Sequence, residues 1–130
     1  MFDSHSEALL KDAAVIWLTT VRPDGQPQGS PVWFVVDDGE FLIYSRPNSP
    51  RLHNIATNSR VSLNLDSNEG SDVLTIEGEA RLLDGPSNKD HAAYQAKYQT
   101  LIARLGSDPE SFAVAYSVPL KVKPGRWRAY

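Results

Sequence analysis

The chain has 130 residues, 41% of them hydrophobic and 22% charged, which is typical of one soluble globular domain spanning residues 1–130. The net charge of −3 argues against a general nucleic-acid binder, because binding to the phosphate backbone depends on clustered positive charge. There is no cysteine, which excludes disulfides, thiolate metal ligands and thiol nucleophiles.

Local patterns predict the elements in chain order. The first half is expected to hold a helix over 5–12, strands over 13–21, 26–36 and 40–45, a helix over 50–58 and a strand over 61–65. The second half is expected to hold a strand over 72–83, a helix over 88–105, and strands over 112–118 and 120–129. β-Branched and aromatic residues favour the strands, and short segments with Gly, Pro or Asp favour turns between them.

A serine is expected to begin each of the three helices. Ser4, followed three residues later by Glu7, fits a capping box. Ser49 precedes Pro50, and proline suits the first helical position. Ser87 is placed at the start of the long helix.

In two of the predicted elements, the residue pattern indicates which face packs against the rest of the protein. One face of strand 72–83 is expected to pack through alternate residues, namely Leu74, Ile76, Gly78, Ala80 and Leu82. The long helix has apolar and aromatic residues at helical spacing, namely Tyr94, Tyr98, Leu101, Ile102 and Leu105. We interpret this second set as an ordinary packing stripe rather than as part of a cofactor site.

Strands dominate the predicted order, and they lack the alternation with helices that is typical of a parallel sheet. Six or seven antiparallel strands, mostly joined by short turns, predict a mainly β fold. A closed or partly split β-barrel with peripheral helices is expected, because closing the sheet removes its exposed edges.

The N-terminal segment MFDSHSEALL has acidic residues and no long apolar core, so it lacks the features of a signal peptide. No apolar run approaches the roughly 20 residues that span a bilayer. We therefore expect a cytoplasmic protein with no membrane partner.

The segment YSRPNSPRLHNI, residues 44–55, is unusual in its cations. Arg51 falls in the first turn of a predicted helix, where the helix dipole disfavours a cation by ~0.3–1 kcal/mol. A helix N-terminus instead favours an anion through its unpaired N–H groups. Ser45 and Ser49 add hydroxyl donors, and Arg46 and Arg51 add forked donors suited to phosphate. The segment predicts an anion site; the alternative is a normal helix start with exposed arginines.

From its first strand to strand 72–83, the chain resembles the flavin-binding split-barrel family of pyridoxamine 5′-phosphate oxidase-like proteins. The resemblance is carried by VIWLTTVRPDGQPQGSPVWFVVDDGEFLIYSRPNSPRLHNIATNSRVSLNL and by the ending YSVPLKVKPGRWRAY. It is most marked with small members that use the deazaflavin coenzyme F-420. The resemblance implies a six-stranded antiparallel split β-barrel with peripheral α-helices. It also implies a homodimer with a flavin-type cofactor in a groove between the subunits.

In such proteins the cofactor ring lies along the second strand, and its phosphate lies where the third strand meets the following helix. The cofactor-binding residues that the resemblance implies are Ser30, Pro31, Val32, Trp33, Tyr44, Ser45, Arg46, Arg51, Asn54, Trp127 and Arg128. Trp33 considered alone favours a place in the core or at a subunit interface. Trp127 and Arg128 would reach the cofactor of the other subunit; the alternative is an exposed strand with solvated charges.

The activity implied is hydride transfer from reduced F-420 to a small planar or conjugated substrate. FMN is the alternative cofactor, because both carry a phosphate suited to Arg46 and Arg51. The cofactor itself does the hydride chemistry, so no catalytic residue is assigned. A non-catalytic flavin- or deazaflavin-binding carrier and a structural dimer without a ligand are the other two candidates.

Neither vitamin oxidation nor metal binding is expected. Pyridoxamine-phosphate oxidases themselves are longer and end in a basic, proline-containing segment that this chain lacks, so vitamin oxidation is not predicted. The histidines His5, His53 and His91 show no ligand spacing, so no metal site is predicted.

Overall fold

The computed structural model describes the backbone of all 130 residues and every side chain except that of Ser67. The elements are, in order, α1 (Ser4–Asp12), β1 (Ile16–Val21), β2 (Pro27–Val32), β3 (Val35–Asp37), β4 (Glu40–Ser45), α2 (Pro50–Thr57), β5 (Arg60–Ser67), β6 (Asp72–Leu82), the 3-10 helix η1 (Asn88–Asp90), α3 (Ala92–Arg104), α4 (Pro109–Ala115) and β7 (Val118–Ala129). Over the described residues, no helix is both long enough and apolar enough to cross a membrane.

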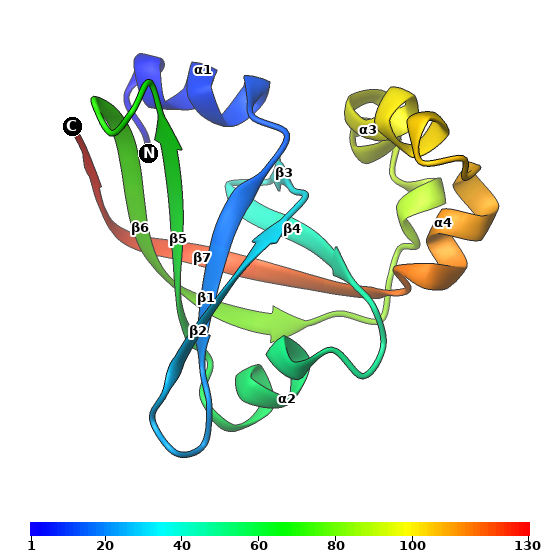
Figure 1. Cartoon of the computed structure of the whole chain (residues 1–130), viewed down its shortest axis with the longest axis horizontal. Helices are drawn as coiled ribbons and strands as arrows, with labels where there is room; N and C mark the ends of the chain where they lie inside the picture. Colours follow the sequence, from blue (N-terminus) through cyan, green and yellow to red (C-terminus); the bar gives the residue numbers. More distant parts are fainter.

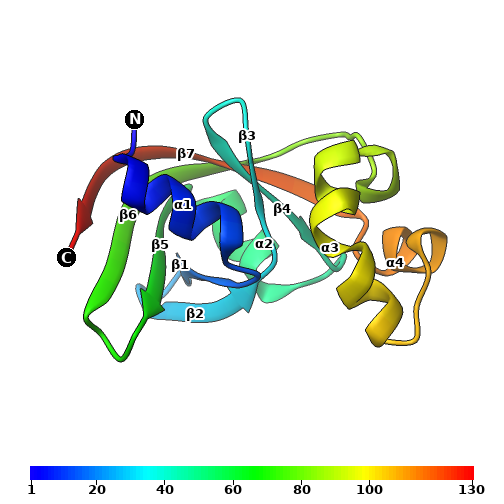
Figure 2. The same cartoon turned by 90° about the horizontal axis from the view of Figure 1, so that it is seen from above.

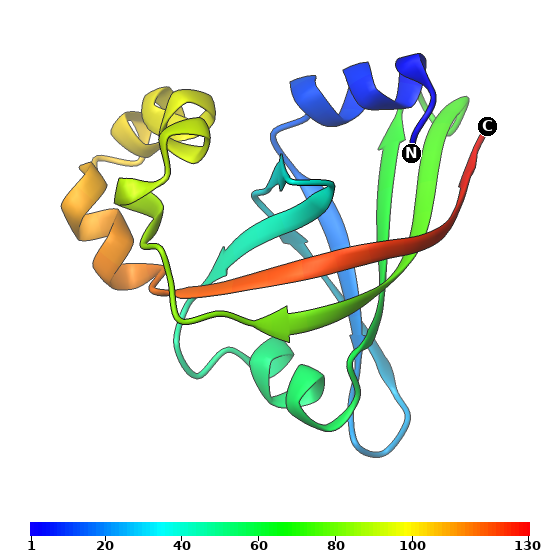
Figure 3. The same ribbon diagram turned by 180° about the vertical axis from the view of Figure 1, so that it is seen from behind.

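The strands form one antiparallel sheet in the order β2-β1-β5-β6-β7-β4-β3, which curls into a half-barrel (Figure 1). Helix α1 lies across one end of the half-barrel and α2 lies at the opposite end (Figure 3). Helices α3 and α4 lie together at one side of it (Figure 2). The expected mainly β split-barrel with peripheral helices is confirmed, with seven strands where the resemblance implied six.

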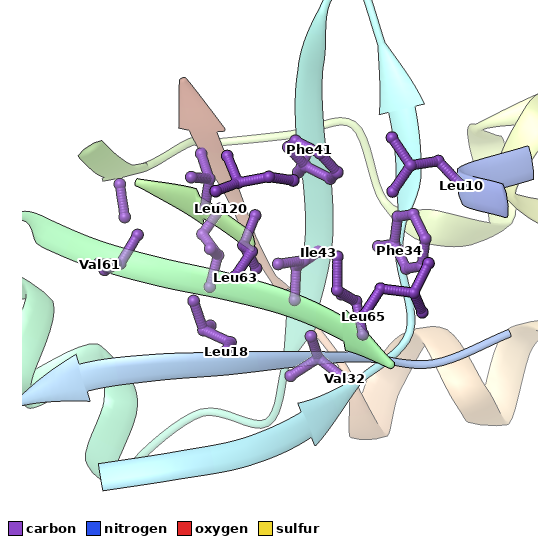
Figure 4. Packing of buried hydrophobic residues seen from close by; sticks show 14 of the residues in the cluster. Leu10, Leu18, Val32, Phe34, Phe41, Ile43, Val61, Leu63, Leu65 and Leu120 are labelled. Carbon is purple, nitrogen blue, oxygen red and sulfur yellow. The ribbon is translucent and has the colours of Figure 1, made fainter. Parts of the chain in front are cut away.

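The main hydrophobic core fills the concave side of the curled sheet, where side chains from facing strands interdigitate (Figure 4). Its fully buried members include Leu18, Phe34, Phe41, Ile43 and Leu63. Burial of each side chain of this size contributes about 1.5–3 kcal/mol. This packing fixes the inward faces of β1, β4 and β5, and therefore sets the positions from which polar residues at the strand ends project.

The strand expected over 26–36 is split into β2 and β3 because α3 binds the backbone between them. The Phe34 N–H donates to the Tyr98 hydroxyl oxygen at 2.7 Å. The single proton of that hydroxyl faces the carbonyl oxygens of Phe34, at 2.9 Å, and Ala14, at 2.8 Å. The Lys97 ammonium also donates to the Phe34 carbonyl at 2.9 Å. With its N–H and C=O engaged by α3, Phe34 takes no part in the sheet, and the strand ends before it.

Two of the expected helix starts were wrong. The Asp3 carboxylate, not the Ser4 hydroxyl, caps α1 by accepting from the Ser6 N–H at 2.8 Å. Helix α3 begins after His91, whose Nδ1 accepts from the Tyr94 N–H at 3.2 Å. Ser87 precedes the short η1 instead. The start of α2 after Ser49 is confirmed.

The strand expected over 112–118 was also wrong, because this segment is mostly the helix α4. The Asp108 carboxylate accepts from the Ser111 N–H at 2.9 Å, and Pro109 occupies the first turn. Both features stabilise a helix start. Two residues expected to pack are exposed instead: Leu82 is 47% exposed and Leu105 is 65% exposed.

Lys97 gives the packing of α3 a pH dependence. Its half-buried ammonium lies 3.8 Å from the centre of the Phe34 ring, and burial lowers its pKa from 10.5 to about 8. Between these two pH values the unfolded chain holds more protons than the folded one, so the free energy of unfolding rises with pH. We expect this contribution to be complete above the ordinary lysine pKa and to be lost as pH falls through about 8. Urea denaturation of the wild type and Lys97→Met at several pH values measures it. A parallel pH profile in both proteins would contradict the assignment.

Candidate functional site

Arg51 bridges the split in the half-barrel. Its Nη1 donates to the Ser45 hydroxyl at the end of β4, and its Nη2 donates to the Ser30 hydroxyl in β2, both at 3.0 Å. Strand β2 is one margin of the sheet, and β4 lies next to the other margin. Register pairs β3 with β4 only as far as Leu42, so the last residues of β4 face the split. The guanidinium thus spans the gap that the sheet leaves open.

The charge of Arg51 has no counter-charge within the described part of the chain. Its two bonds are to neutral hydroxyls, and no carboxylate pairs with it among the described side chains. Its Nε is buried and lacks a hydrogen-bond partner. Burial lowers the pKa of Arg51, which shows that the surroundings disfavour the charged form. A buried charge is normally paired, so this environment favours an anionic ligand.

The start of α2 adds donors beside this guanidinium. Ser49 occupies the N-cap position, but its hydroxyl makes no capping bond, and the first turn contains no acidic residue. The N–H groups at the start of the helix are therefore not capped by a side chain. An anion near Arg51 would also be stabilised by the helix dipole.

Three hollows meet at the start of α2. One of them, which has aromatic residues on one wall and which we call the main cavity, has a volume of about 490 Å³. It is lined by Pro31, Val32, Trp33, Tyr44, Arg46, Pro47, Asn48, Ser49, Pro50, Arg51, Tyr94, Leu105, Phe112 and Tyr116. A smaller hollow of about 190 Å³ lies beside Ser30 and Asn54, and a wider groove of about 670 Å³ lies beside Arg22 and His53. Ser49 and Pro50 border all three, so this helix start is the centre of the hollowed surface.

One wall of the main cavity is a stack of aromatic rings. The Trp33 ring lies parallel to the Tyr98 ring, with their centres 4.6 Å apart, and is 5.4 Å from Phe112. Phe112 in turn stacks on Tyr116 at 4.5 Å. The Arg46 guanidinium lies 4.7 Å from the centre of the Tyr116 ring. The stack therefore runs from the packed face of α3 to a cation at the cavity.

Most residues predicted for the cofactor lie at this cavity. Six of them line it, namely Pro31, Val32, Trp33, Tyr44, Arg46 and Arg51. Ser30 and Ser45 hold the Arg51 guanidinium. Trp33 is half-buried and also packs against other aromatic rings. This packing agrees with the place in the core that was considered for Trp33 alone.

The other three do not line the main cavity. The buried Asn54 amide donates to the Thr20 hydroxyl and the Gln28 side-chain oxygen, both at 2.9 Å, and so ties α2 to β1 and β2. Trp127 packs on Phe2 with the ring centres 5.2 Å apart, and Arg128 is exposed beside it. Both belong to the end of β7 distant from the cavity (Figure 1). Their expected contact with a cofactor held by another subunit stays a prediction.

Apart from residues 47–50, which lie within the segment predicted as an anion site, four lining residues were not predicted as site residues, namely Tyr94, Leu105, Phe112 and Tyr116. They come from a helix interpreted as a packing stripe and from a segment interpreted as a strand. The sequence Ser107-Asp108-Pro109 was the available signal, because it indicates a helix start before Phe112. That these helices face Trp33 is a long-range contact that no local pattern indicates.

Two of the three histidines lie beside carboxylates, and the third is exposed. His5 bonds Asp72 at 2.9 Å, and His91 lies 3.5 Å from Asp37 while capping α3. His53 is exposed at the wider groove. No group of three metal-ligating side chains gathers among the residues that the structure describes.

The fold and this cavity define a split-barrel protein with a cavity at the open side of its sheet that contains two arginines and an aromatic wall. The family model for pyridoxamine 5′-phosphate oxidase matches residues 2–130, so the chain belongs to that family. No curated protein sequence matches the chain.

Solved structures share the fold at low sequence identity. The conserved hypothetical protein Rv2991 of Mycobacterium tuberculosis is 19% identical, with a TM-score of 0.81 over 100% of this chain and 84% of that one. A protein described as an F-420 reductase is 24% identical, with a TM-score of 0.70 over 94% of each chain. HutZ, the heme storage protein of Vibrio cholerae, is 15% identical, with a TM-score of 0.71 over 98% of this chain and 93% of that one.

The unpaired charge of Arg51 predicts a specific response to phosphate. Inorganic phosphate at tens of millimolar should raise the melting temperature of the wild type more than that of Arg51→Met, because an anion bound only by the folded chain stabilises it. Thermal unfolding followed by circular dichroism measures the difference. Arg81→Met, which removes an arginine already paired with Glu40, should respond like the wild type. Equal shifts in all three proteins would mean that phosphate acts only as an excluded salt.

Proposed function

We propose that the chain binds a flavin-type cofactor, coenzyme F-420, in the main cavity and reduces a small planar or conjugated substrate. The observation that carries the proposal is the Arg51 guanidinium, which is half-buried, held by two hydroxyls and without a carboxylate partner among the described side chains. A cofactor phosphate would supply the missing negative charge. Membership of the pyridoxamine 5′-phosphate oxidase family supports a flavin-type ligand.

The residues at the cavity fit such a cofactor in two parts. Ser30, Ser45 and Arg51 would hold the phosphate, with Arg46 adding a second positive charge. Pro31 and Val32 continue β2 away from Ser30 and would lie along the ring. A cavity of about 490 Å³ is within the usual range for small-molecule sites, roughly 300–1,000 Å³.

When bound, the reduced cofactor would supply a hydride to the substrate. The residues of the chain would position the cofactor and limit the access of water. F-420 is preferred to FMN because of the sequence resemblance, and the fold shared with an F-420 reductase agrees with that choice. The phosphate-binding residues suit either cofactor.

A non-catalytic carrier is the second candidate. The fold shared with a protein described as a heme storage protein supports this candidate. The two functions differ in a simple assay, in which the protein is titrated with FMN and F-420 and then supplied with reductant and planar acceptors. Tight cofactor binding without turnover of any acceptor would favour the carrier.

We also propose that two copies of the chain associate beside the cavity. Trp17 projects from the outer face of β1 and is 47% exposed. Register places it opposite Pro31, which lines the main cavity. A second subunit covering Trp17 would therefore contribute to the same groove, in agreement with the homodimer that the resemblance implies.

Replacing Arg51 by alanine should weaken cofactor binding at least tenfold, or about 1.4 kcal/mol. The fold should lose little stability, because the substitution also removes a charge that burial disfavours. Fluorescence titration with F-420 and FMN measures affinity, and urea denaturation measures stability. Arg81→Ala is the matched control, since that arginine is exposed and paired with Glu40. Unchanged affinity in Arg51→Ala would remove this residue from the cofactor site.

The proposed dimer should depend on Trp17. A charged side chain at a buried interface is costly, so Trp17→Arg should shift the chain toward monomer. Analytical ultracentrifugation over a range of concentrations gives the association constant. The comparison variant is Val114→Arg, because Val114 is 76% exposed on α4 and outside the proposed interface. A wild type that remains monomeric would overturn the proposed association.

A further inference from the structure

The hydroxyl of Tyr94, a buried residue, has no hydrogen-bond partner among the described side chains. Tyr94 is 1% exposed and lines the main cavity. The neighbouring Tyr44 hydroxyl donates to the Pro86 carbonyl, and the Tyr98 hydroxyl is bonded at the β2–β3 break. Among the described residues, no hydrogen bond engages the hydroxyl of Tyr94. Because buried tyrosine hydroxyls are usually bonded, this one is available to a ligand.

That hydroxyl is also not completely enclosed. The side-chain atoms of the described residues that are both completely buried and without a partner are Arg51 Nε and Asn88 Oδ1. The Tyr94 oxygen is not one of them, so it keeps some accessible surface, and Tyr94 is one of the residues that line the cavity. Burial raises the pKa of Tyr94, which keeps the hydroxyl protonated and able to donate.

The surrounding wall attracts electron-rich groups. Phe112 stacks with Trp33 at 5.4 Å and with Tyr116 at 4.5 Å, so this part of the wall consists of aromatic rings. Arg46 and Arg51 add full positive charges, and no Asp or Glu is among the lining residues that the structure describes.

We propose that this aromatic end of the main cavity, formed by Trp33, Tyr94, Leu105, Phe112 and Tyr116, binds a planar carbonyl compound whose oxygen accepts a hydrogen bond from the Tyr94 hydroxyl. Flat apolar walls suit a ring system, and the donors suit the lone pairs of a carbonyl. A ligand carboxylate or phosphate is better matched to the opposite end, where Arg51 lies on α2. In a reductase, this subsite would hold the substrate that accepts the hydride. That assignment rests on the proposed reductase function, whereas the binding of a planar carbonyl compound does not.

The test uses two probes of similar ring shape, 1,4-naphthoquinone and naphthalene, in equilibrium dialysis with the purified protein. The absence of cysteine prevents thiol adducts of the quinone. Tyr94→Phe removes only the hydroxyl and should lower the affinity for naphthoquinone about three- to tenfold, the usual effect of losing one neutral hydrogen bond. Its affinity for naphthalene should not change.

Tyr130→Phe is the control, because it removes a hydroxyl from a tyrosine that is 62% exposed and does not line the cavity. It should leave the affinity for both probes unchanged. The proposal is overturned if Tyr94→Phe leaves naphthoquinone binding unchanged, or if it weakens both probes equally. It is likewise overturned if the wild type does not bind naphthoquinone.

Repeating the dialysis with saturating FMN or F-420 separates the subsite from the cofactor site. Naphthoquinone should still bind, with the same dependence on Tyr94. Displacement of the probe by either cofactor would assign the aromatic end to the cofactor and overturn the proposal. If neither cofactor binds but the Tyr94-dependent affinity remains, the proposed function fails while the carbonyl subsite stands.

Discussion

The site depends on how the split in the half-barrel is bridged. Strand β2 and the end of β4 do not pair with each other, and the Arg51 guanidinium reaches across to Ser30 and Ser45 instead. Because both partners are neutral hydroxyls, the bridge fixes the geometry without cancelling the charge. A carboxylate at either position would hold the guanidinium more strongly and would remove the reason for an anion to bind there. The choice of serine therefore joins structural closure to ligand binding.

The opposite end of the cavity depends on the early termination of β2. Tyr98 and Lys97 engage the backbone of Phe34, and the preceding Trp33 stacks on the ring of Tyr98. Strand β2 consequently presents Ser30 at a cationic end and leads to Trp33 at an aromatic end. The cavity acquires two chemically different ends because one short strand is held at two places, by α2 and by α3.

The sequence indicated those parts of the molecule that local chemistry determines. Strand Glu40–Ser45 and the helix starting at Pro50 follow from alternation and capping, and Arg51 was conspicuous because its charge opposes the helix dipole. The capping error at α1 arose because adjacent polar residues could each cap, and only the three-dimensional path selects Asp3. Helix α4 was missed because the β-branched and aromatic run after Phe112 outweighed the start signal at Asp108. The aromatic wall depends on contacts between distant segments, which local patterns do not contain.

Asn54 illustrates that predicting where a site residue lies does not predict what its side chain does. The resemblance associated it with the phosphate, yet both hydrogens of its amide are engaged by Thr20 and Gln28. These bonds anchor α2 against β1 and β2 one turn beyond Arg51, so they determine where the guanidinium can reach. A buried amide can thus be as necessary to the site as the cation that it positions, whether or not it also contacts the ligand. The same reasoning applies to Ser30 and Ser45, because their hydroxyls fix the location of the charge.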